Sequence, residues 1–87
     1  MAYLMIVDDD EDFTSALTTT LRAAGYEVEV ECDPAAAMEK MEARTPDLAI
    51  LDVMFPEDAS AGFALARSLR QRNDALRNIP ILMLTAV

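Results

Sequence analysis

A chain of 87 residues forms at most one small domain, and its 53% hydrophobic content is enough for a packed core. Sixteen acidic against seven basic residues give a net charge of −9, which argues against direct binding of nucleic acid or an anionic membrane. Cys32 is the only cysteine, so an internal disulfide is excluded. The N-terminal apolar run is too short for a signal peptide or a membrane span, and we expect a cytoplasmic protein.

The first half of the chain predicts a strand, a helix and a second strand. Residues 3–7 are continuously apolar, as in a strand covered on both faces. Residues 10–24 change to helical spacing before Gly25, with an expected buried face of Phe13, Ala16, Leu17, Leu21 and Ala24. Residues 26–32 alternate strictly, which predicts an edge strand with Val28, Val30 and Cys32 on one face and Glu27, Glu29 and Glu31 on the other.

The second half predicts two helices, each followed by an apolar strand. Asp33 and Pro34 form an N-cap and a first helical residue, and this helix should end before Pro46 with Ala35, Met38 and Met41 facing inward. Residues 48–53 form an apolar strand closed by Asp52. The next helix is expected to bury a face around Phe63, Ala66, Leu69 and Arg70, and a last apolar run covers residues 79–87.

Alternation of strands and helices predicts a doubly wound parallel α/β sheet. The edge strand and right-handed crossovers allow the strand order 2-1-3-4, and ligands in such sheets bind at the carboxyl ends of strands beside the switch point. Asp8, Asp9 and Asp52 fall at those ends. The last run is apolar on both faces, so a further strand or another covering element is expected beside it.

Converging carboxylates at strand ends bind a hard cation, share a proton, or cap the strands in solvent. Mg²⁺ prefers oxygen ligands, and Asp9 and Asp52 could supply two, with a backbone carbonyl from the loop after Asp52. Asp52 could then act as a nucleophile and form an aspartyl phosphate. The hydroxyl of Thr85, at the end of the next strand, could donate to a phosphoryl oxygen.

Simpler interpretations compete with this site. Asp10, Glu11 and Asp12 favour a helix N-terminus through the helix dipole, and Asp8 and Asp9 could be caps as well. Asp52 alone would be a turn residue, and Thr85 alone an ordinary strand residue. An EF-hand is excluded, because Phe13 stands at its required glycine and Thr19 at its bidentate glutamate.

In this order and spacing the motifs resemble the receiver domain of two-component response regulators. They are "IVDDD" ending the first strand, "LAILDVMFP", "AGF" opening the third helix, and "PILMLTA". The resemblance implies a flavodoxin-like fold that accepts a phosphoryl group on Asp52 from a sensor histidine kinase or a phosphotransfer domain. It also implies a site for Mg²⁺ or Mn²⁺, with Asp9 and Asp52 as direct ligands, Asp8 bound through a water, and the backbone carbonyl of Met54 as a further ligand. The phosphoryl group would be contacted by the switch hydroxyl of Thr85 and by the backbone amide of Ala86.

The sequence departs from the family pattern in two places. The loop from Asp52 to Gly62 is longer than usual and has Ala61 where an acidic residue is common. The later segment of receivers, which carries a phosphate-binding lysine and an aromatic switch residue, has no counterpart, and Lys40 on the second helix does not replace that lysine. We therefore expect residues 1–87 to be one receiver domain, truncated or incompletely observed at its C-terminus.

Three functions remain distinct at this point. The leading hypothesis is a phosphoacceptor that switches conformation, with no enzymatic activity beyond its own phosphorylation and dephosphorylation, and able to form a homodimer as receivers do. The alternative is a receiver-like interaction module or scaffold that no longer switches. A phosphatase of the haloacid dehalogenase type would need an aspartate at position 54, where Met54 stands.

Overall fold

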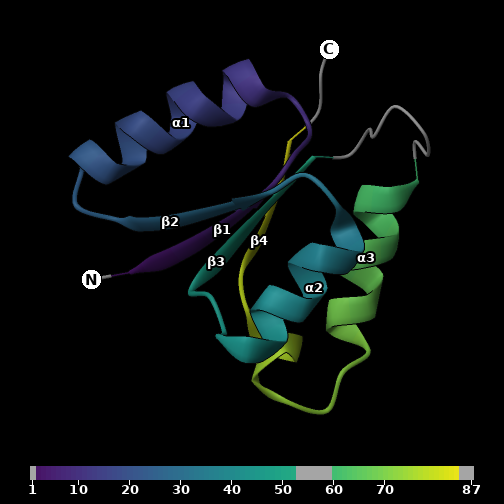
Figure 1. The fold of residues 1–87 in the computed structure, drawn as a ribbon. Helices are drawn as coiled ribbons and strands as arrows, with labels where there is room; N and C mark the ends of the chain where they lie inside the picture. The colour runs from purple at the N-terminus through teal and green to yellow at the C-terminus, as the bar shows by residue number, and fades with distance from the viewer. Residues whose placement is uncertain (1, 53–59, 85–87) are drawn as a thin grey trace.

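A four-stranded parallel sheet with helices on both faces is seen in the computed structural model, which describes residues 2–52 and 60–84 (Figure 1). The strand order is β2-β1-β3-β4, as predicted. The strands are β1 (Tyr3–Val7), β2 (Glu27–Glu31), β3 (Leu48–Asp52) and β4 (Ile81–Leu84). The helices are α1 (Glu11–Ala23), α2 (Pro34–Ala43), α3 (Ala61–Arg70) and the short 3₁₀ helix η1 (Ala75–Asn78).

The predicted helix boundaries are confirmed by their capping contacts. Asp10 is the N-cap of α1, and Asp33 is the N-cap of α2 with Pro34 at the first helical position. Gly25 follows the C-cap of α1 with φ of 98°, a left-handed conformation that favours glycine. Local sequence alone is therefore sufficient to begin and end these two helices.

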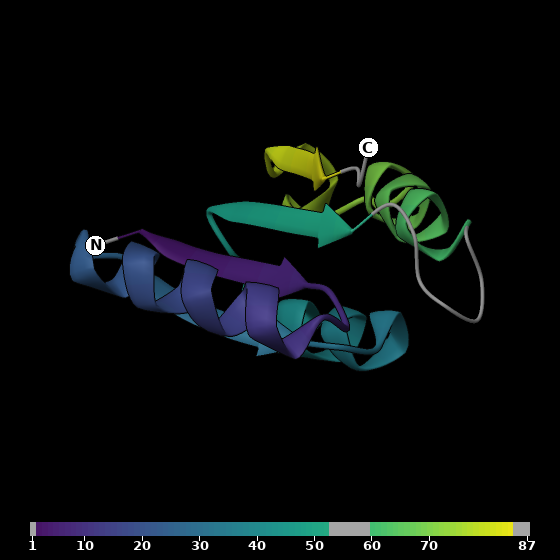
Figure 2. The same cartoon turned by 90° about the horizontal axis from the view of Figure 1, so that it is seen from above.

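The helices cover the two faces of the sheet, with α1 on one side and α2 and α3 on the other (Figures 1 and 2), and each face has its own hydrophobic core. On the face covered by α2 and α3, the odd-numbered residues of β1 pack with residues of both helices, in a cluster that includes Met5, Val7, Met41, Leu51 and Leu69. On the opposite face, α1 packs its Leu17 and Leu21 against Leu4, Ile6, Val28 and Ile50. β1 is buried along its whole length, as its continuous apolar sequence predicted.

The buried face of α1 agrees only in part with the predicted one. Thr14 and Thr18 are buried, whereas Phe13, Ala16 and Ala24 are exposed. The helix packs against β2, and the threonines occupy the helix face that is most enclosed. Leu17 and Leu21 pack on the sheet as predicted, and together with Phe13 they line an apolar groove, so the apolar pattern gave part of the buried face and missed the two threonines.

Smaller corrections apply to the other two helices. In α2, Ala37 is buried with Met41, while Ala35 is exposed. In α3, Leu65 and Leu69 are buried, whereas Phe63 is 55% exposed and Arg70 is exposed as well. The expected inward positions Met38, Met41, Ala66 and Leu69 do belong to the core or pack against it, so only part of each predicted face is wrong. The element η1 was not predicted.

An apolar groove lies on the α1 face of the sheet, beside β3 and β4. Its volume is about 320 Å³, and it is lined by Leu4, Phe13, Leu17, Leu21, Tyr26, Leu48, Ile50, Leu82 and Leu84. Within the described residues β4 is an edge strand, and Leu82 is 49% exposed. The expected covering element beside β4 therefore stays a prediction. None of the helices in residues 2–52 and 60–84 has the length and apolar character needed to cross a membrane.

Candidate metal centre

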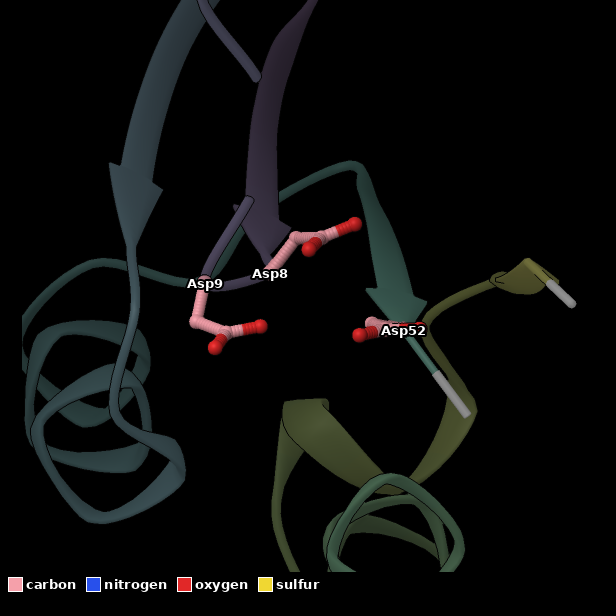
Figure 3. A group of neighbouring side chains, drawn as sticks. All are labelled: Asp8, Asp9 and Asp52. Atoms are coloured by element: carbon pink, nitrogen blue, oxygen red, sulfur yellow. The ribbon is translucent and has the colours of Figure 1, made fainter. Parts of the chain in front are cut away.

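Three aspartates meet at the carboxyl ends of β1 and β3 (Figure 3). Asp52 is the last residue of β3, and Asp8 and Asp9 follow β1 directly. The parallel pairing of Val7 with Leu51 brings the two strand ends together. One carboxylate oxygen from each aspartate lies within 4.8 Å of the other two. The predicted convergence of the three aspartates is confirmed.

Asp8 is the most enclosed of the three. Its amide donates to the carbonyl of Glu31 at 3.1 Å, and its carboxylate accepts from the amide of Asp10 at 3.0 Å. The residue is buried, and burial raises the pKa of its carboxyl group. The amide of Asp10 acts against this increase in pKa, while the negative charges of Asp52, Asp10 and Asp9 add to it.

Mutual repulsion makes this arrangement costly when all three groups are ionised. Two unit charges about 5 Å apart repel by about 3 kcal/mol at an effective dielectric constant of 20. A divalent cation between the carboxylates would replace that repulsion by attraction. Mg²⁺ commonly uses one or two carboxylates, keeps several waters and accepts phosphate oxygens as further ligands. The donor set of Asp8, Asp9 and Asp52 fits such an ion.

Four further residues were considered for the site in the sequence analysis. Met54, Thr85 and Ala86 lie outside the described residues. Lys40 lies on α2, where its ammonium group is 2.7 Å from the Glu31 carboxylate and 3.7 Å from that of Glu29. These contacts agree with the expectation that Lys40 does not replace a phosphate-binding lysine.

Sequence reasoning missed the pairing of β2 with α2. The glutamates of β2 alternate with the inward-facing valines as predicted, and Glu27 and Glu29 are exposed. What was not predicted is that Lys40 and Arg44 pair with this row. Arg44 contacts Glu27, and its guanidinium carbon also lies 3.9 Å from the centre of the Tyr3 ring. Lys40 and Arg44 are four residues apart, a spacing that matches glutamates on alternate positions of β2. This match was the sequence signal that could have predicted the ion pairs.

Comparison with known proteins points to one family. A family model described as "Response regulator receiver domain" matches residues 4–87. The alkaline phosphatase synthesis transcriptional regulatory protein PhoP of Bacillus subtilis is 39% identical over 95% of this chain. The phosphate regulon transcriptional regulatory protein PhoB of Rhizobium meliloti is 40% identical over the same share. These matches cover 32% and 35% of the relatives, so the chain spans about a third of their length.

Solved structures agree with the fold. The receiver domain of a signal transduction histidine kinase from Syntrophus aciditrophicus has a TM-score of 0.88 at 33% identity, covering all of this chain and 64% of its own. The N-terminal domain of a response regulator receiver protein from Methanoculleus marisnigri also has a TM-score of 0.88, at 29% identity, covering 100% of this chain and 68% of its own. The parallel sheet with order 2-1-3-4 is therefore shared with solved receiver domains.

Proposed function

Because this chain belongs to the receiver domain family of two-component response regulators, we propose that it accepts a phosphoryl group on Asp52 in a Mg²⁺-dependent reaction. The observation that carries the proposal is the convergence of Asp52 with Asp8 and Asp9 at the carboxyl edge of the sheet. This convergence places the proposed nucleophile beside two further oxygen donors for Mg²⁺.

The reaction consists of one displacement at phosphorus. A carboxylate oxygen of Asp52 attacks the phosphoryl group of a phosphohistidine, the bond from phosphorus to the imidazole nitrogen breaks, and an aspartyl phosphate forms. The electron pair of the broken bond remains on the imidazole of the donor. When bound, Mg²⁺ neutralises charge on the carboxylates and on the phosphoryl oxygens, so that two anions can approach each other.

Each residue near the site has a distinct proposed role. Asp9 and Asp52 would bind the ion directly, and Asp8 would hold one of its waters. The carbonyl of Met54 would be a further ligand. The Thr85 hydroxyl would turn toward the phosphoryl group as the switch, with the Ala86 amide donating beside it. Mn²⁺ would fit the same oxygen ligands.

The proposed partner is a sensor histidine kinase or a phosphotransfer domain, because its phosphohistidine supplies the phosphoryl group. The domain itself would catalyse only its own phosphorylation and dephosphorylation. The chain matches about a third of the length of the two transcriptional regulators named above. We therefore also propose that the natural protein is longer than these 87 residues and that its output function lies in another domain.

Mass spectrometry tests this function. The protein is incubated with Mg²⁺ and a small phosphodonor, and we expect an added mass of about 80 Da, that of one phosphoryl group on a carboxylate. Asp52→Asn should abolish the added mass completely. Asp12→Asn is the matched control, because Asp12 is an exposed member of the same acidic run and lies outside the cluster.

Two outcomes would contradict the proposal. An added mass that persists in Asp52→Asn would place the phosphoryl group on another residue. No added mass in the wild-type protein, although Mg²⁺ is bound, would favour the interaction module or scaffold that no longer switches.

A further inference from the structure

We propose that Asp10 is a positioning residue of the metal centre, because one residue both starts α1 and holds the carboxylate of Asp8. The proposal rests on the function proposed above, in which Asp8 belongs to a Mg²⁺ site. The sequence predicts only a helix-terminal role for Asp10, and its contact with Asp8 is found in the structure.

The first half of this coupling is the N-cap of α1. A carboxylate oxygen of Asp10 accepts from the amide of Phe13 at 3.0 Å, and the Asp10 carbonyl accepts from the amide of Thr14 at 2.9 Å. Two contacts to the first turn therefore fix the backbone of Asp10 at φ −80° and ψ 100°. The position of the Asp10 amide follows from this fixed backbone.

The second half is the contact of that amide with Asp8. The Asp10 amide donates to the Asp8 carboxylate at 3.0 Å, and the Asp8 amide is itself held by the carbonyl of Glu31 at 3.1 Å. The turn from β1 into α1 is thus attached to β2 at its start and to α1 at its end. Asp8 is only 8% exposed, so few waters are available to replace the amide of Asp10 as a hydrogen-bond donor.

The consequence is that the cap of α1 preorganises a carboxylate of the cation site. The hydrogen bond from the Asp10 amide fixes the direction in which the Asp8 carboxylate points. Contacts that orient the ligands of a metal commonly change its affinity by about 10- to 100-fold when they are removed. Loss of the cap would leave the Asp10 amide free to move away from Asp8.

Titration calorimetry with Mg²⁺ alone tests the coupling in two variants of equal charge. Asp10→Ala removes the cap, and we expect Mg²⁺ affinity to fall about tenfold. Asp10→Ser loses the same charge but keeps an oxygen that can accept from the Phe13 amide, so affinity should stay within about threefold of wild type. The difference between the two variants isolates the cap from the charge.

Asp33→Ala is the matched control for general destabilisation. Asp33 caps α2 in the same way, accepting from the Ala36 amide at 3.0 Å on its side chain and from the Ala37 amide at 2.9 Å on its carbonyl. It makes no contribution to the aspartate cluster. We expect this variant to lose stability about as much as Asp10→Ala does, with Mg²⁺ affinity unchanged.

Equal losses of affinity in Asp10→Ala and Asp10→Ser, or a similar loss in Asp33→Ala, would overturn the proposal. Hydrogen exchange in the metal-free protein separates this failure from that of the proposed function. The amide of residue 10 should be protected in wild type, unprotected in Asp10→Ala and protected again in Asp10→Ser. If wild type bound no Mg²⁺, the proposed function would fail, while this amide would still show whether Asp10 holds Asp8.

Discussion

The glutamates along β2 and the aspartates at the ends of β1 and β3 are two groups of three carboxylates in the same small sheet. On β2, the chain supplies its own cations: Lys40 pairs with Glu29 and Glu31, and Arg44 pairs with Glu27. The hydrogen bond from Arg44 lowers the pKa of Glu27. These three carboxylates are therefore satisfied within the fold.

The aspartate cluster has the opposite electrostatic character. Burial raises the pKa of Asp8, and the negative charges of Asp52, Asp10 and Asp9 raise it further. The comparison teaches that three nearby carboxylates do not by themselves indicate a cation site. What distinguishes the aspartates is their convergence at one edge of the sheet, together with the raised pKa of the buried Asp8.

The largest expected difference between the two groups is in Mg²⁺ affinity. Asp9→Asn removes one negative charge and one carboxylate oxygen from the cluster, and we expect Mg²⁺ affinity to fall by more than about tenfold. Glu29→Gln removes the same charge from the β2 row and should leave the affinity within about twofold, because long-range attraction between exposed charges is screened by salt. Calorimetric titration of both variants at the same ionic strength makes the comparison.

Equal losses of affinity in these two variants would mean that total charge attracts Mg²⁺ and that the cluster does not bind it specifically. An intact affinity in Asp9→Asn would remove Asp9 from the set of direct ligands.

A smaller difference is expected in how stability depends on pH. The pKa of Asp8 is raised in the folded, metal-free protein, so its stabilising contribution is present below the ordinary aspartate pKa of about 3.9 and is lost as pH rises through the raised value. The pKa of Glu27 is lowered, so its contribution is present above the ordinary glutamate pKa of about 4.3 and is lost as pH falls through the lowered value.

Urea unfolding in EDTA at a series of pH values measures the two contributions. Relative to wild type, Asp8→Asn should gain stability as pH rises above about 3.9, whereas Glu27→Gln should lose stability as pH rises toward about 4.3 and stay constant above it. The effect at Glu27 is expected to be the smaller, because its ion pair with Arg44 is exposed and screened. Slopes of the same sign in both variants would contradict the electrostatic contrast.

Much of the fold followed from local sequence patterns. The continuous apolar run of β1, the alternation in β2 and the caps at Asp10 and Asp33 each reflect a short-range rule, and all four are confirmed. The convergence of Asp8, Asp9 and Asp52 followed from topology, because parallel strands bring their carboxyl ends to one edge.

Features that depend on packing between elements were not predictable in the same way. The rotation of α1 buries Thr14 and Thr18 because of how the helix lies on β2, and its own apolar stripe does not contain that information. The pairing of Arg44 with Glu27 depends on how α2 crosses back over the β2 strand. The contact of the Asp10 amide with Asp8 depends on the geometry of a single turn.

The most direct test of the account is the free energy of unfolding with and without Mg²⁺. We expect the wild-type protein to gain about 2.7 kcal/mol when Mg²⁺ is present at 100 times its dissociation constant, since the ion binds the folded state. Glu29→Gln should gain nearly as much at that concentration, and Asp9→Asn should gain far less. An unchanged free energy of unfolding for wild type at all Mg²⁺ concentrations, or an equal gain in Asp9→Asn, would contradict the claim that the aspartate cluster is the cation site.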